Sequence, residues 1–89
     1  MPLFLSTHQA PGLSGEEIAS YAPEVAKNVH ATFKNLYANS TSGAIFTLYE
    51  APSADDLREE FDRVGFPVDE IHEIDAAVDA DAVRAMAGQ

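Results

Sequence analysis

A strand pattern passes directly into a helix pattern in residues 44–64, which read AIFTLYEAPSADDLREEFDRV. Residues 44–50 are rich in apolar, aromatic and β-branched side chains, and Ala51-Pro52 ends the run because proline cannot donate to a sheet. Ser53 has an acidic residue three positions later, which is typical of a helix N-terminus. The helix pattern then shows an apolar stripe and a terminating glycine: Leu57, Phe61, Val64 and Gly65.

Two further elements are predicted on the N-terminal side. Apolar residues in the segment 3–8 alternate with polar ones closely enough to indicate a strand. Ser14 and Glu17 form a capping-box pattern, and apolar residues at helical spacing follow it. Pro23 lies inside that pattern, so the helix is either kinked there or begins near Ser20 with the proline in its first turn.

The remaining segments complete a strand, helix, strand, strand, helix, strand order. Residues 31–38 are predicted to pair with 44–50 across a polar turn, and residues 72–76 to form a short final strand. This order is typical of the ferredoxin-like α+β fold, a βαββαβ antiparallel sheet with helices on one face. We expect one domain over residues 1–76. Residues 77–89 are alanine-rich and predicted to be a tail or a short helix.

Apolar side chains are predicted on both faces of this sheet, although two helices can cover only one. They oppose each other along three strands: Leu3 and Leu5 oppose Phe4, Ile45 and Tyr49 oppose Phe46 and Leu48, and Phe33 and Tyr37 oppose Leu36. In antiparallel sheets with one solvent-exposed face, apolar and polar residues normally alternate more regularly along each strand. We therefore expect a homodimer in which two sheets pack face to face as a dimeric α+β barrel. The alternative is a set of scattered surface residues beneath a folded-back tail.

Composition excludes several classes of partner and site. Fifteen acidic residues against five basic ones give a net charge of −10, so nucleic acid and anionic membrane surfaces are not expected as partners. The chain has no cysteine, which excludes disulfides and thiolate metal sites. No export signal or membrane-spanning run is evident, so a cytoplasmic protein is expected. The acidic excess with two lysines predicts a salt-adapted, halophilic source.

A family resemblance rests on the amino-acid sequence of residues 50–74, in particular EAPSAD at 50–55, GFP at 65–67 and DEIHEI at 69–74. The chain resembles a family of small prokaryotic proteins catalogued as a domain of unknown function, one branch of which is described as nickel-binding. The resemblance implies a ferredoxin-like fold and a homodimer. It also implies histidines near the end of the first strand and on the second helix. His8 matches the first place, whereas Glu60 stands at the second.

A metal site is one of three functions that the sequence leaves open. The first and last strands should be neighbours, so His8 and His72 are predicted to lie together, with Glu60 completing the set and Glu70 or water in the remaining positions. His30 is placed at the opposite end of the sheet and excluded. A carboxylate in place of an imidazole suits zinc or manganese as well as nickel. The plain alternative is a pair of hydrogen-bonded, solvated histidines.

The other two functions are an enzyme and an interaction module. By analogy of fold, the protein could be a cofactor-independent monooxygenase or isomerase whose cavity is lined by His8, Tyr37, Tyr49 and His72. No sequence motif for catalysis or phosphate binding supports this. A large cavity holding a polar histidine would favour catalysis, whereas a filled core would favour metal binding. The third candidate is an acidic module that binds a basic partner without metal. No physiological role is predicted.

Overall fold

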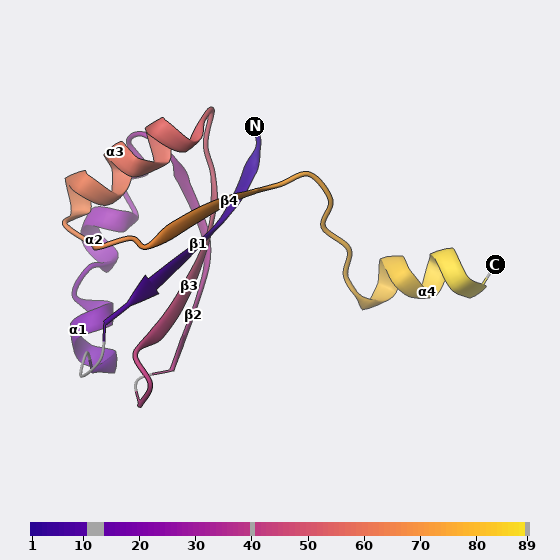
Figure 1. The fold of residues 1–89 in the computed structure, drawn as a ribbon, viewed down its shortest axis with the longest axis horizontal. Coiled ribbons are helices and arrows are strands. Elements are labelled where there is room, and N and C mark those ends of the chain that lie inside the picture. The colour runs from indigo at the N-terminus through magenta and orange to yellow at the C-terminus, as the bar shows by residue number, and fades with distance from the viewer. Residues whose placement is uncertain (11–13, 40, 89) are drawn as a thin grey trace.

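Four antiparallel strands form one sheet in the order β2-β3-β1-β4 (Figure 1). The structure is a computed structural model that describes residues 1–10, 14–39 and 41–88. The strands are β1 (Leu3–Gln9), β2 (Thr32–Asn39), β3 (Ala44–Glu50) and β4 (Glu70–Ile74). The α+β class and the antiparallel sheet predicted from the sequence are thereby confirmed.

Of the helices in the described residues, three cover one face of the sheet and a fourth stands apart (Figure 1). The covering helices are α1 (Gly15–Ala19), α2 (Ala22–Val25) and α3 (Ala54–Val64), and the fourth is α4 (Ala80–Gly88). The Ser14 capping box and the Ser53 cap are both formed, and Gly65 ends α3 at φ 78°. The first predicted helix is two short ones, because Pro23 lies in the first turn of α2 rather than inside a continuous helix.

Two details of the strands differ from the prediction, and both decide which face a side chain occupies. A register shift between Phe33 and Asn35 turns Phe33 and Leu36 to the helix side and Tyr37 to the other side, whereas strict alternation had placed Phe33 with Tyr37. The last strand is Glu70–Ile74 rather than 72–76, and it pairs Leu5 with His72. A one-residue change in alternation moves a side chain to the opposite face.

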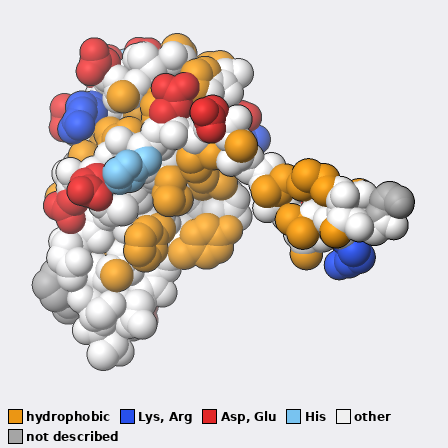
Figure 2. Space-filling view, turned by 45° about the vertical axis from the view of Figure 1, so that its right-hand side comes forward, with side chains coloured by type: hydrophobic (Ala, Val, Ile, Leu, Met, Phe, Trp, Pro, Cys, Tyr) orange, Lys and Arg blue, Asp and Glu red, His pale blue; other side chains and the backbone are white. Residues whose placement is uncertain are grey.

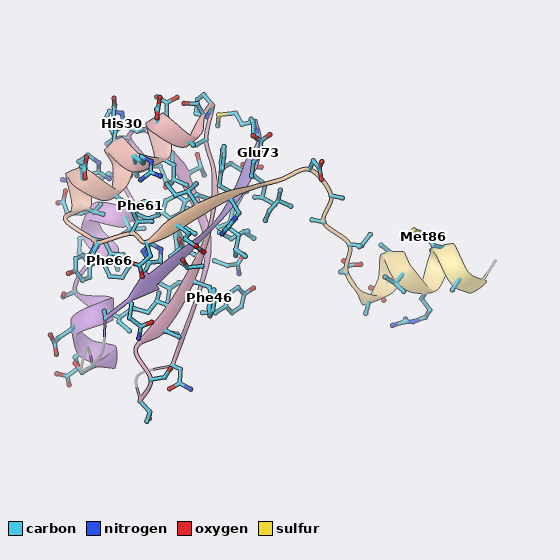
Figure 3. The ribbon with its side chains drawn as sticks, viewed as in Figure 1. His30, Phe46, Phe61, Phe66, Glu73 and Met86 are labelled. Atoms are coloured by element: carbon cyan, nitrogen blue, oxygen red, sulfur yellow. The ribbon has the colours of Figure 1, made fainter. Side chains whose placement is uncertain are left out.

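The core lies between the sheet and the helices. Its most deeply buried large members are Phe4, Ile45, Tyr49, Leu57 and Phe61, each 2% exposed or less. Tyr49 meets Phe61 edge to face at 5.2 Å between ring centroids. Figure 3 shows Phe61 and Phe66 on this side of the sheet, whereas Phe46 points away from it.

The other side of the sheet carries the second apolar surface that the sequence predicted. We call it the open face; its apolar members are Leu3, Leu5, Tyr37, Phe46, Leu48 and Ile74. Tyr37 and Phe46 are 58% and 41% exposed. Figure 2 shows hydrophobic side chains gathered on the surface beside the helix that stands apart, with a histidine and acidic groups nearby. Figure 1 shows α1, α2 and α3 on the opposite side of the sheet and α4 standing clear of it, so no described helix covers the open face.

Helix α4 makes the molecule longer than its residue count requires. The radius of gyration is 14.5 Å, against about 12 Å expected for a compact domain of this length. The large apolar side chains of α4 are exposed to solvent: Val83 is 50% and Met86 67% exposed. At the start of α4, the Asp79 carboxylate accepts a hydrogen bond from the Ala82 N–H at 2.8 Å. Among the described residues, no helix is long and apolar enough to cross a membrane.

Candidate functional site

His8 is buried at the end of β1, on the helix side of the sheet. It is 2% exposed and packs against Phe61 and Phe66 at 4.9 and 4.8 Å between ring centroids. Its Nδ1 lies 2.7 Å from the Pro67 carbonyl oxygen, and its Nε2 lies 2.9 Å from the Thr47 hydroxyl. A carbonyl can only accept, so Nδ1 carries the proton and donates.

Burial lowers the pKa of His8, although the Pro67 carbonyl and the Asp69 carboxylate act in the opposite direction. The neutral ring then has Nε2 as an acceptor, and Thr47 donates to it. Both nitrogens are engaged, so this imidazole has no free lone pair for a metal.

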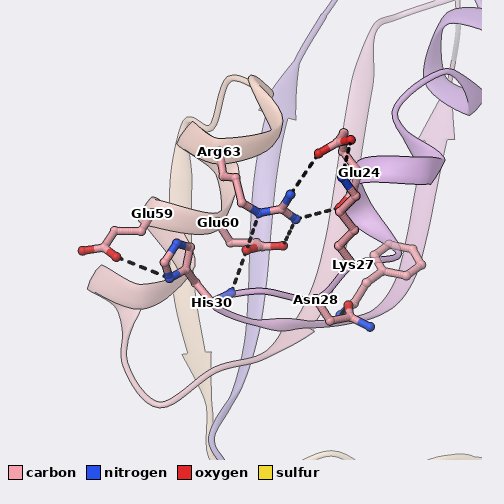
Figure 4. A network of polar contacts seen from close by, with 8 residues as sticks. Glu24, Lys27, Asn28, His30, Glu59, Glu60 and Arg63 are labelled. Carbon is pink, nitrogen blue, oxygen red and sulfur yellow. Dashed lines mark hydrogen bonds and ion pairs between the residues drawn. The ribbon is translucent and has the colours of Figure 1, made fainter.

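Glu60 is fully buried on α3 and belongs to a network that joins three segments (Figure 4). Its Oε2 accepts from the Arg63 guanidinium at 2.6 Å, and its Oε1 accepts from the His30 backbone N–H at 2.8 Å. Arg63 also donates to the Glu24 carbonyl at 2.6 Å and pairs with the Glu24 carboxylate at 3.2 Å. The network ties α3 to the end of α2 and to the segment that enters β2.

The pKa of Glu60 is lowered as a net result. Burial acts to raise it, but the hydrogen bonds from Arg63 and the His30 backbone outweigh burial. The carboxylate is therefore ionised and fully used by protein donors. Its chemistry is that of a structural ion pair rather than of a metal ligand.

His72 lies on β4 and faces away from the helices. Its side chain is 57% exposed, and its Nε2 lies 3.1 Å from the Glu70 carboxylate, which is 66% exposed. Leu5 is its partner across the β1–β4 pair, so His72 borders the open face. His30 forms a comparable pair with Glu59 at 3.5 Å, beside α3 (Figure 4).

The structure does not bring His8, His72 and Glu60 together, which corrects the predicted juxtaposition. His8 and His72 lie on opposite faces of the sheet, because β4 pairs Leu5, and not His8, with His72. Glu60 reaches the His30 end, which sequence reasoning had set aside. Within residues 1–10, 14–39 and 41–88, no group of three or more metal-ligating side chains is close enough to hold an ion.

A cavity of about 330 Å³ lies between the sheet and the helices. Its wall is almost entirely apolar and includes Val25, Phe33, Leu36 and Phe66, with Thr47 and Tyr49 contributed by β3. Among the four residues predicted to line a catalytic cavity, only Tyr49 does so. His8 is linked to the wall through Thr47, whereas Tyr37 and His72 face outward.

Two residues that sequence reasoning missed organise this region. Arg63 follows Glu60 by three positions, a helix spacing that could have revealed the ion pair. Thr47 offered no comparable signal, because a threonine in a strand is ordinary. Its role depends on the pairing that puts Ser6 opposite Thr47 and the His8 ring within reach of its hydroxyl.

Comparison with known proteins identifies relatives of most of the chain. The family described as "Nickel responsive protein SCO4226-like" matches residues 4–74. The crystal structure of SCO4226 from Streptomyces coelicolor A3(2) is similar with a TM-score of 0.76 and 28% sequence identity, covering 85% of this chain and 99% of that chain. No curated protein matches. Helix α4 lies beyond the residues that the family matches.

Proposed function

Because the chain belongs to the nickel responsive SCO4226-like family, we propose that it is a ferredoxin-like homodimer that binds nickel at the border of its open face. The observation that carries the proposal is an exposed apolar sheet face edged by the accessible His72–Glu70 pair. The family description supports the choice of metal, and the accessible His72–Glu70 pair supports the choice of place.

Strand order supports the ferredoxin-like assignment. In the sheet order β2-β3-β1-β4, the two crossovers, β1 to β2 and β3 to β4, each contain helices on the same face. That is the arrangement of a split βαβ sheet. This topology leaves the opposite face of the sheet without a helix, whatever side chains that face carries.

The exposed apolar side chains of the open face support the proposal that a second copy of the chain packs against that face. A small domain loses stability when large apolar side chains such as Phe46 stay in water, and a twofold axis lets one surface cover itself. Helix α4 projects on the open-face side of the sheet (Figure 1). A partner packed on that face therefore lies beside α4, whose Val83 and Met86 are bare in a single chain.

The nickel ligands we assign to each chain are His72 and Glu70. An imidazole nitrogen and a carboxylate oxygen are both suitable donors for nickel, and zinc shares this preference. His8 and Glu60 do not serve, because their donor atoms are occupied by Pro67, Thr47, Arg63 and the His30 backbone. One chain offers two donors, so the dimer brings the second pair.

Calorimetric titration of the full chain with nickel and with zinc tests this proposal. We expect nickel binding in the wild type, with at least a tenfold loss of affinity in His72→Gln, because each lost ligand removes a coordinate bond. His30→Gln is the matched control, since His30 is partly exposed and also paired with a glutamate. Equal nickel affinity in wild type and His72→Gln, or loss in His30→Gln alone, would contradict the assignment.

A further inference from the structure

The cavity on the helix side of the sheet is a second feature, independent of the open face. Its volume of about 330 Å³ is large for a domain of 89 residues. Ligand pockets start at roughly 300 Å³, whereas ordinary packing leaves few voids larger than a water molecule. The cavity is bounded by α1, α2, α3, β2 and β3, so covering the open face does not fill it.

Charge is missing from the cavity wall. Among the described residues that line it, none is Asp, Glu, Lys, Arg or His. A charged ligand would lose its hydration there without gaining a partner, which is costly. The acidic protein, with a net charge of −10, disfavours anions further.

Two hydroxyl groups are the polar features contributed by the sheet. Thr47 and Tyr49 sit two residues apart on β3, and both line the cavity. Thr47 donates its proton to the neutral His8, so the lone pairs of its oxygen are left to accept from another donor. Burial raises the pKa of Tyr49 to about 12, so its phenol stays protonated and can donate.

We propose that this cavity binds a small neutral molecule that is mainly hydrocarbon and carries one hydroxyl group, with Thr47 and Tyr49 as its polar anchors. The aromatic rings of Phe33, Phe61 and Phe66 favour a flat ring in the apolar part. Thr47 offers an acceptor and Tyr49 a donor, and a ligand hydroxyl can bond with either of them.

Three probes of similar size separate the effects of apolar burial, a hydroxyl group and a charge on binding. They are naphthalene, 2-naphthol and 2-naphthoate. Each is titrated into the full chain, with binding followed by the amide NMR shifts of the whole protein. We expect naphthalene to bind, 2-naphthol to bind roughly three- to tenfold more tightly through its hydrogen bonds, and 2-naphthoate not to bind. The shifts should fall on α2, β2 and β3 residues that face the cavity.

Variants locate the site and test the role of its hydroxyl groups. Ala22→Trp places a large ring at the exposed rim of the cavity, and Ala80→Trp is its control on α4. We expect Ala22→Trp to weaken 2-naphthol at least tenfold and Ala80→Trp to have no effect. Tyr49→Phe should reduce the preference for 2-naphthol over naphthalene while keeping naphthalene binding.

Several results overturn the proposal. Equal binding of all three probes, shifts confined to the open face, or unchanged affinity in Ala22→Trp would each contradict a site in this cavity. Equal affinity of the wild type for naphthalene and 2-naphthol would contradict the role of the two hydroxyls. None of these results depends on nickel, so the two proposals fail separately.

Discussion

The imidazole of His8 makes folding stability depend on pH. Burial lowers its pKa in the folded protein below the ordinary value of 6.5. Between those two pKa values the unfolded chain binds a proton that the folded chain does not, so stability falls as pH decreases. Above pH 6.5 the ring is neutral in both states, and its full contribution is present.

We predict that the melting temperature of the wild type falls more steeply below pH 6.5 than that of His8→Gln. Glutamine offers a donor and an acceptor but does not titrate. His72→Gln is the control, because His72 is 57% exposed and we expect the wild-type profile for it. Parallel profiles for wild type and His8→Gln from pH 8 to pH 5 would refute this prediction.

The Glu60 carboxylate also makes folding stability depend on pH, but in a lower pH range than His8. We expect Glu60→Gln to lose about 2 kcal/mol of unfolding free energy at neutral pH, because a buried charge-assisted pair is replaced by a neutral amide. Since the folded pKa of Glu60 is lowered, its stabilisation is present above the unfolded value of 4.5 and disappears as pH falls through the folded pKa.

Urea unfolding at two pH values measures this effect. The difference between wild type and Glu60→Gln should shrink from pH 7 to pH 3. Glu59→Gln is the neighbouring control, with a side chain 62% exposed, and should change stability little. A difference that is constant with pH would show that the Glu60 carboxylate is not the group involved.

At the scale of elements, the end of α3 depends on the backbone of Gly65. Its φ of 78° is unfavourable for residues with a Cβ atom, while no atom lies within 4 Å of an added Cβ. We predict that Gly65→Ala costs about 1 kcal/mol, seen as a melting temperature about 4–8 °C lower. Gly15→Ala, also uncrowded but inside a helix, should be neutral or slightly stabilising. Equal melting temperatures for the two variants would contradict this explanation.

Local signals predicted the elements, but not the faces on which some of their side chains lie. Caps at Ser14 and Ser53 are formed by neighbouring residues, so the sequence carries them directly. The bulge near Phe33 and the register of β4 depend on pairing with distant strands. Those two features separate His72 from His8 and Tyr37 from Phe33. The predicted metal set is not assembled for this reason, although the strands form the antiparallel sheet that the sequence predicted.

The charge of the whole molecule gives a prediction about salt. At a net charge of −10, self-repulsion destabilises the folded chain in dilute buffer. A Debye length of about 3 Å in 1 M salt removes most of that repulsion. We predict a higher melting temperature in 1 M KCl than in dilute buffer. An unchanged or lower value in KCl would contradict the salt-adapted interpretation.

The open face and α4 together predict that the protein works as a pair of chains. Phe46, at 41% exposure, lies within the open face, whereas Val29, at 56%, precedes β2 and is not part of that face. A glutamate at position 46 would be buried between two sheets of a dimer, which is costly without a partner. Val29 is more than half exposed, so the same change there leaves the added charge largely in water.

Sedimentation equilibrium of the full chain, across micromolar concentrations and in both dilute and molar salt, measures the assembly. We predict a mass twice the 9.6 kDa of one chain for the wild type and for Val29→Glu, and a shift towards the single-chain mass for Phe46→Glu. A wild-type mass of 9.6 kDa under all these conditions would contradict the pairing of open faces.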